Sequence, residues 1–183
     1  MAPRIPPLPK EGRDPKTADL LDGLSAFNGT ELNIFATLAH HPRLLKRWSA
    51  FGGVLLYGGA LPARERELLI LRTGYLCQAP YEWGQHVAIG LAAGLSDEEI
   101  ARVAAGPDAS GWSDADALLL RATDELHADS RIGDATWAAL AEQWDDQQLI
   151  EVCMVVGQYH LVAMTLNSLG VEPETDDFPV LPA

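Results

Sequence analysis

The stretch that decides the fold of this protein is Glu67-LLILRTGYLCQAPYEWGQ-His86. It is strongly apolar, and Pro80 interrupts it, because a proline has no N–H to donate and pushes its predecessor away from helical angles. We therefore expect one helix to end near Leu76 and Cys77. A second helix should begin at Pro80, since proline is favoured at the first helical position.

Three ionisable side chains lie in these two expected helices. Glu82 and His86 are four residues apart and so share one helical face, and Glu67 lies on an otherwise apolar face of the first helix. Carboxylates and an imidazole that point toward a core are costly unless they pair, and their pKa values shift. Such groups are typical of acid–base sites. Ordinary structural ion pairs are the alternative interpretation of the same residues.

A metal site is not expected in this segment. Zinc takes three or four protein ligands, and the segment offers one Glu–His pair without a second local histidine cluster.

The composition argues against several functions. Among 183 residues, 26 are acidic and 13 basic, which gives a net charge of −13. Nucleic-acid binding requires a basic patch, so neither nucleic acid nor an anionic membrane surface is an expected partner. Two cysteines without a disulfide framework, no signal peptide and no spanning segment predict a cytoplasmic protein.

Hydrophobic periodicity predicts a single all-α domain. We expect a Pro-rich arm over residues 1–17, one helical bundle over 18–171 and a second tail over 172–183. No useful strand pattern is present. Helices should open at Pro42, Pro62, Pro80, the capping box Ser96–Glu99, Ser113 and Asp134, and a last one should cover Gln147–Leu169.

The last expected helix is apolar around nearly its whole circumference, which is typical of a helix buried on all sides. A domain of this size has little room for such a helix unless a second subunit covers one side. We therefore expect a homo-oligomer. Gln158, Tyr159 and His160 interrupt the apolar run and could line a site, although a hydrogen-bonded core histidine is the simpler interpretation of His160.

Three segments carry a family resemblance. They are RERELLILRTGYLCQAPYEWGQHVAIGLAAGLSDEEI, RATDELHADSRIGDATWAAL and DDQQLIEVCMVVGQYHLVAMTLNSLG, and together they span roughly residues 30–172. They resemble the carboxymuconolactone decarboxylase family, which includes the alkylhydroperoxidase-D-like proteins. The resemblance implies a helical bundle that assembles as a dimer, trimer or hexamer.

The redox branch of that family has the pattern E-x11-C-x2-C-x3-H. With His86 as the anchor, the glutamate falls on Glu67, and the two cysteine positions fall on Ala79 and Glu82. Both redox sulfurs are therefore replaced, and Cys77 lies two residues too early. A dithiol peroxidase needs one thiol to attack and another to resolve the sulfenic acid. The proton-handling groups remain, so acid–base chemistry is expected.

The sequence thus predicts a cofactor-free, decarboxylase- or lyase-like enzyme for a small organic acid, lactone or enolisable carbonyl compound. His86 is the expected proton donor and acceptor, Glu82 its orienting partner, and Glu67 the partner acid or positioning group. Side chains that could contact the substrate are Arg72 as a carboxylate clamp, Tyr75, Cys77, Trp83, Gln158 and His160.

Two other functions stay open. One is a weak thiol-dependent peroxidase in which Cys77 reacts and His86 acts as its base. The other is a non-catalytic, oligomeric binding protein that has lost its redox cysteines.

Overall fold

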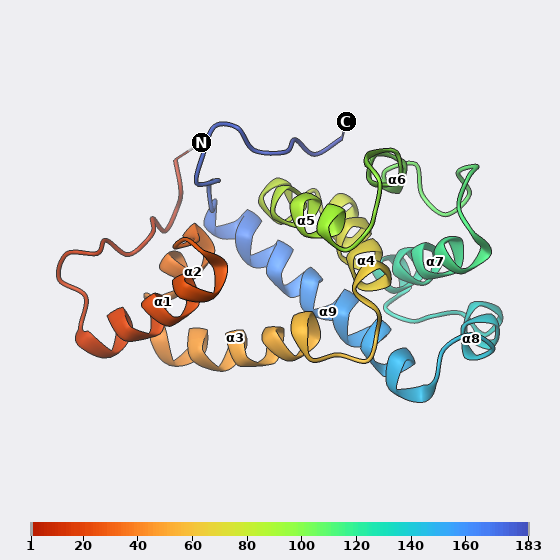
Figure 1. The fold of residues 1–183 in the computed structure, drawn as a ribbon, viewed down its shortest axis with the longest axis horizontal. Helices are drawn as coiled ribbons and strands as arrows, with labels where there is room; N and C mark the ends of the chain where they lie inside the picture. The colour runs from red at the N-terminus through yellow and green to blue at the C-terminus, as the bar shows by residue number, and fades with distance from the viewer. Residues whose placement is uncertain (1, 183) are drawn as a thin grey trace.

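The computed structural model describes residues 2–182, without the side chains at 27 and 28, and every regular element in this part of the chain is a helix (Figure 1). The expected all-α architecture is confirmed. The helices are α1 (Pro15–Asn28), α2 (Asn33–Leu38), α3 (Pro42–Tyr57), α4 (Ala63–Leu76), α5 (Pro80–Ala92), α6 (Asp97–Val103), α7 (Asp114–Asp129), α8 (Asp134–Ala141) and α9 (Asp146–Leu169).

Proline, glycine and capping side chains set most helix ends. The predicted break in the decisive stretch is confirmed, with Cys77 as the C-cap of α4 and Pro80 as the first residue of α5. Between them Gln78 has a φ of 49°, in the left-handed region. Both hydrogen bonds of the predicted capping box at the start of α6 are present. The short helix α2 was not predicted, because no side chain caps its N-terminus.

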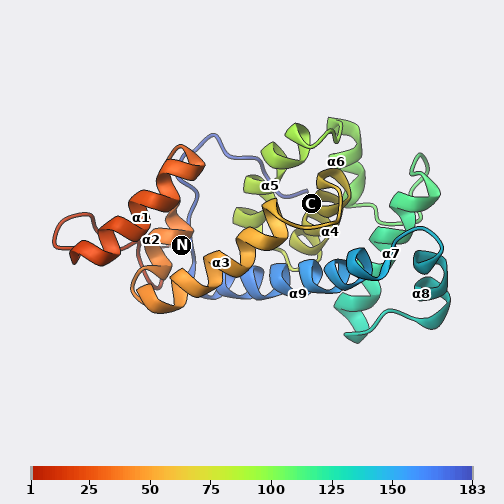
Figure 2. The same ribbon diagram turned by 60° about the horizontal axis from the view of Figure 1, so that its bottom comes forward.

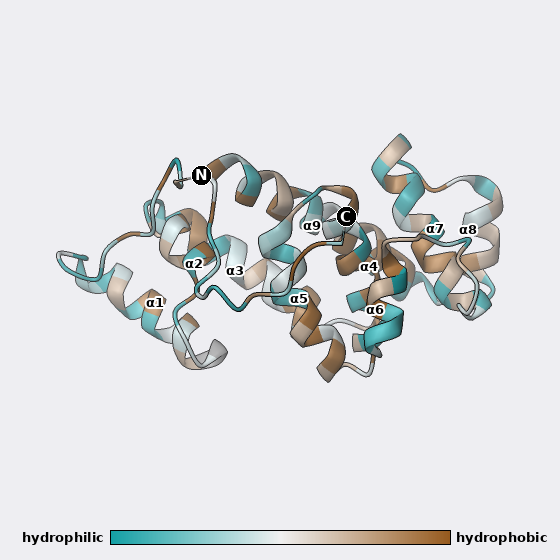
Figure 3. Cartoon of the chain, turned by 90° about the horizontal axis from the view of Figure 1, so that it is seen from above, coloured by the Kyte–Doolittle hydropathy of each residue, from teal (hydrophilic) through white to brown (hydrophobic). Residues whose placement is uncertain are grey.

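Helix α9 runs through the middle of the molecule, with α3 lying along it (Figures 1 and 2). Helix α4 packs against α5, α7 and α9. The largest apolar cluster lies where α4, α7 and α9 meet and includes Leu69, Ile70, Leu119, Val152 and Val156. Hydrophobic residues accordingly colour much of α4 and α5, while α6 begins with hydrophilic residues (Figure 3). The decisive stretch therefore lies in the packed centre of the fold.

Both terminal segments lie against the helices of their own chain. In the N-terminal arm, the Leu8 N–H donates to the Ala36 carbonyl at 3.0 Å, and α1 begins at Pro15. In the C-terminal tail, the Tyr81 hydroxyl donates to Glu174 at 2.6 Å. The N-terminal arm thus packs within its own chain, where its backbone donates a hydrogen bond to that of α2.

One face of α9 carries large exposed apolar side chains. By length and composition, α9 would pass as a membrane span, but 50% of the relevant window is buried inside the domain, as in a core helix. The exposed residues are spaced by four, seven and three positions and so form one stripe. They are Ile150 (64% exposed), Met154 (43%), Leu161 (51%) and Met164 (64%).

We propose that a second copy of the chain covers this stripe of α9, as the sequence led us to expect. Light scattering should then give a mass that is a multiple of 19.8 kDa. The double substitution Leu161→Asp and Met164→Asp should yield monomers with an unchanged circular dichroism spectrum, because charge cannot be buried in an apolar interface.

The matched control is Val180→Asp, which changes an apolar residue that is 85% exposed and lies outside the stripe. It should leave the assembly intact. A wild-type mass of 19.8 kDa at micromolar concentration would contradict the proposal.

Candidate active site

A buried glutamate–histidine pair joins α4 to α5. His86 Nδ1 lies 2.7 Å from Glu67 Oε2, and the Glu67 side chain is completely buried. The other oxygen of Glu67 accepts from Arg66 Nε at 3.2 Å. Because the carboxylate can only accept, Nδ1 carries the imidazole proton and Nε2 keeps a free lone pair. The ring of Tyr159 meets the imidazole edge-on, with the ring centroids 4.8 Å apart, and fixes its plane.

Glu82 is the unusual group of the site. Its side chain is buried, and neither carboxyl oxygen has a hydrogen-bond partner. Burial raises the pKa of Glu82 well above its ordinary value. This shift favours the protonated form of the carboxyl group. The close packing depends on Gly74 of α4, where an added Cβ would lie 3.3 Å from Glu82 Oε1.

The expected role of Glu82 as the orienting partner of His86 is wrong. The partner is Glu67, which reaches the imidazole from α4. Spacing four residues apart places Glu82 and His86 on one face of α5, but it does not decide which neighbour the ring meets across the helix interface.

A cavity of about 180 Å³ opens beside these groups. Its walls come from α1, α2, α3, α5, α9 and the α1–α2 loop, and most of them are apolar. An apolar cavity of about 150 Å³ can hold a benzene ring, so the space suits one small ring. The polar side chains on its wall are Ser49, Tyr57, Tyr81, Glu82, Gln85, His86, Gln158 and Tyr159.

Gln158 was expected near the substrate, and it lines the cavity. Gln85 and Trp48 also line the cavity and were not predicted. Gln85 could have been found from the sequence, because Glu82, Gln85, His86 and Ile89 follow the spacing of one helical face. Trp48 carried no such signal, since only tertiary packing brings α3 to α5.

Arg72 does not act as a carboxylate clamp. Its guanidinium donates to both oxygens of Asp124, at 2.6 and 2.9 Å, and to the Val103 carbonyl at 2.8 Å. It is absent from the cavity wall. The expectation failed because the partner of Arg72 lies on α7, which sequence spacing did not place beside α4.

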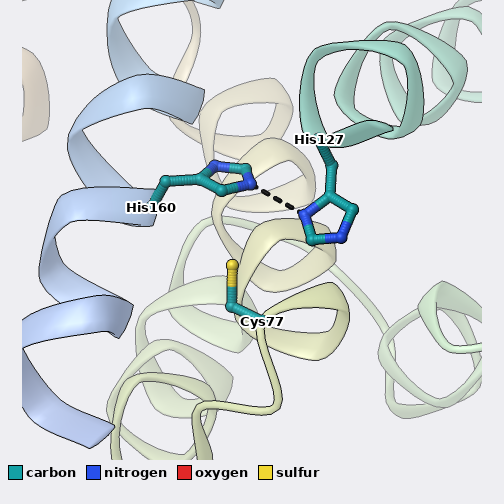
Figure 4. Close-up of side chains that lie close together, drawn as sticks. All are labelled: Cys77, His127 and His160. Atoms are coloured by element: carbon teal, nitrogen blue, oxygen red, sulfur yellow. Dashed lines mark hydrogen bonds between the residues drawn. The ribbon is translucent and has the colours of Figure 1, made fainter. Parts of the chain in front are cut away.

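Four other expected contact residues also lie away from the cavity, namely Tyr75, Cys77, Trp83 and His160. Tyr75 and Trp83 pack edge to face, with ring centroids 6.4 Å apart, in an apolar cluster between α4, α5 and α6. Cys77 lies near His127 and His160 (Figure 4). Aromatic packing and a separate cluster thus account for side chains that the sequence placed near the substrate.

Residues 42–125 match the carboxymuconolactone decarboxylase family. The matched segment contains the Glu67–His86 pair, Glu82 and Cys77. No curated protein sequence matches the chain.

Several solved structures share the fold. An uncharacterised peroxidase-related protein from Ralstonia eutropha JMP134, described as an alkylhydroperoxidase AhpD core, is 21% identical with a TM-score of 0.82, over 94% of both chains. One from Silicibacter sp. TM1040 is 15% identical with a TM-score of 0.81, over 96% of both chains. The debrominase Bmp8, in complex with 2,3,4-tribromopyrrole, is 12% identical with a TM-score of 0.79, over 96% of this chain and 94% of that one. Residues 42–125 are therefore similar to the carboxymuconolactone decarboxylase family, and the chain shares its fold with the alkylhydroperoxidase AhpD core structure.

Proposed function

We propose that this protein is a cofactor-free acid–base enzyme that moves a proton at a carbon atom beside a carbonyl group. The observation that carries the proposal is the buried, unpartnered carboxyl group of Glu82, which lines the same cavity as the imidazole of the Glu67–His86 pair. A carboxyl group whose pKa is raised by burial, next to an imidazole held by a hydrogen bond, offers an acid and a base at one site.

The two groups would divide the work. His86 Nε2 takes a proton from the carbon next to the carbonyl, and the electron pair of that C–H bond moves toward the carbonyl oxygen. The protonated Glu82 donates a hydrogen bond to this oxygen and stabilises its growing negative charge. The imidazolium, held by Glu67, then returns the proton to a carbon of the enolate. In a decarboxylation, loss of CO2 would generate the same enolate, and an imidazolium would protonate it.

The cavity favours an uncharged substrate over a small organic acid. Among the residues that the structure describes, its wall contains no lysine or arginine, and Arg72 is held by Asp124. The volume suits a lactone or a cyclic enolisable carbonyl compound. The debrominase with this fold binds a small planar ring, which supports a substrate of that size.

A thiol peroxidase based on Cys77 receives less support. Burial, and secondarily the charge of Glu82, raises the pKa of the Cys77 thiol to about 11. Little thiolate then exists at neutral pH, and the thiolate is the nucleophile. The expected base, His86, is held by Glu67, while Cys77 has His127 and His160 beside it.

Substitutions at the site should slow proton exchange. With small lactones and cyclic ketones in D2O, deuterium uptake by NMR should fall about 10²–10⁴-fold in His86→Ala. Glu82→Gln should lose activity as well, because an amide N–H is a weaker hydrogen-bond donor to the growing negative charge than a carboxylic acid. Glu67→Gln should lose less, and adding it to His86→Ala should change little, because groups that act as a unit are not additive.

The control for these exchange rates is Glu142→Gln, an exposed carboxylate outside the cavity. It should exchange protons at the wild-type rate. Full exchange in a folded His86→Ala protein would refute the mechanism.

The buried carboxyl group should also make stability depend on pH. The pKa of Glu82 is raised by folding, so its contribution to stability is full below the ordinary glutamate pKa of about 4.3 and is lost as the pH rises toward the folded-state pKa. Glu82→Gln removes this loss. The melting temperature of the variant relative to wild type should therefore rise between pH 4 and pH 8, by about 2–4 °C for each kcal/mol.

The test compares the two proteins across pH rather than at one pH. Glu82 in the wild type and the glutamine in the variant are both buried without a hydrogen-bond partner, and this cost lowers the stability of both proteins at every pH. Glu142→Gln should show no such trend. A constant difference between Glu82→Gln and wild type would mean that Glu82 is ionised in the folded protein.

Peroxidase turnover should be negligible. With Ala79 and Glu82 at the two redox positions, hydrogen peroxide and a thiol reductant should be consumed no faster than in buffer. Robust peroxide reduction that disappears in Cys77→Ala would overturn the acid–base assignment.

A further inference from the structure

Three potential metal ligands meet outside the cavity. Cys77 ends α4, His127 lies near the end of α7, and His160 lies in the middle of α9 (Figure 4). Their ligand atoms all lie within 4.8 Å of one another. His127 Nδ1 and His160 Nε2 are 2.9 Å apart. None of the three lines the cavity of the proposed acid–base site.

The orientation of His160 is that of a ligand. Its Nδ1 lies 2.8 Å from the Val156 carbonyl. Because a carbonyl only accepts, Nδ1 carries the proton, and the lone pair of Nε2 faces His127. Histidines that bind metal ions usually donate their other N–H to a carbonyl or carboxylate in this way. In this structure that lone pair accepts a hydrogen bond from the N–H at His127 Nδ1.

The backbone that carries Cys77 is held from α9. Asn167 donates through its side-chain amide to the carbonyl of Cys77 at 3.0 Å and to that of Gln78 at 3.2 Å. This fixes the left-handed turn at Gln78, and with it the direction of the preceding cysteine side chain. Helix α9 therefore holds two of the three ligands in place, His160 through the Val156 carbonyl and Cys77 through Asn167.

We propose that Cys77, His127 and His160 bind one Zn²⁺ ion, with a water molecule in the fourth position. One thiolate and two neutral imidazoles are a ligand set that suits zinc, and three protein ligands leave the coordination shell open. The inference is independent of the proposed acid–base activity.

The geometry needs only small side-chain movements. Zinc–ligand lengths of about 2.0–2.3 Å imply ligand separations of about 3.3–3.6 Å in a tetrahedral site. The two histidine nitrogens would move apart slightly, and the sulfur would move inward. His127 is exposed and the other two ligands are half-buried, so the ion has a path from solvent.

The charges and protons balance. At neutral pH the Cys77 thiol is protonated, since its pKa is raised to about 11. A bound zinc ion makes a coordinating thiol lose its proton. The thiol proton leaves to solvent, and the proton on His127 Nδ1 moves to its Nε2. Zinc and one thiolate leave a single positive charge, which lies near the Arg72–Asp124 ion pair.

The test uses Co²⁺ as a spectroscopic substitute for Zn²⁺ on reduced, chelator-treated protein. Titration should give a sulfur-to-cobalt charge-transfer band that saturates at one ion per chain. An equivalent of Zn²⁺ should remove it. The band should disappear in Cys77→Ser, and binding should weaken at least 100-fold in His127→Ala and His160→Ala. Asn167→Ala, which touches no ligand atom, should weaken it about 10–100-fold.

Cys153→Ser is the matched control, because it removes the other free cysteine, also half-buried, and should leave the band unchanged. His86→Ala should also keep it, so failure of the acid–base mechanism would leave this result intact. In the unmodified protein, zinc should protect Cys77 from iodoacetamide. At zinc concentrations 100-fold above Kd, it should raise the melting temperature by about 5–10 °C.

Cobalt binding without a sulfur band in the folded wild-type protein would overturn the proposal. So would a band that survives Cys77→Ser or is lost in Cys153→Ser. Equal alkylation of Cys77 with and without zinc would also refute it.

Discussion

The buried contact between Glu67 and His86 is the interaction on which the centre of the fold depends. It joins α4 to α5, the helices on either side of the turn after Cys77, and it buries a carboxylate in an otherwise apolar core. A buried carboxylate is tolerated when it is hydrogen-bonded, and Arg66 supplies the second partner. Breaking the pair would leave an uncompensated charge, so the two helices and the imidazole orientation are held by the same bond.

Glu82 is a second buried glutamate, but its surroundings differ from those of Glu67. It lies one helical turn from His86, yet it remains without a hydrogen-bond partner. Such a group costs free energy of folding, and native proteins contain few of them. Its presence beside a cavity is more easily understood as a function than as packing. By the resemblance to the redox branch of the carboxymuconolactone decarboxylase family, a cysteine would be expected at this position, where this chain has a carboxyl group.

Much of the fold could be predicted because its signals are local. Pro80, the capping box of α6 and Gly170 at the end of α9 mark helix ends within a few residues of sequence. The location of His86 and Glu82 at a cavity also followed from a face of one helix. The hydrogen-bond partners of the buried charged residues could not be predicted in this way, since Arg72 meets Asp124 across the α4–α7 interface.

The same limit applies to clusters assembled from distant elements. Cys77, His127 and His160 come from three helices, and no spacing along the chain connects them. Likewise, the wall that α3 contributes to the cavity depends on how α3 lies along α9. Tertiary packing decides these neighbours, and a single sequence carries no periodic signal for it.

The C-terminal tail has a consequence for the order in which the molecule is made. Glu174 accepts from the Tyr81 hydroxyl, from Gln85 Nε2 and from the backbone N–H of Asn33, and so ties the cavity-lining face of α5 to the start of α2. The helices that carry the acid–base groups are synthesised before α9 and Glu174, which complete the surrounding wall. A nascent chain therefore holds His86 and Glu82 in an unfinished pocket until residues up to Glu174 have been synthesised and have packed onto α5.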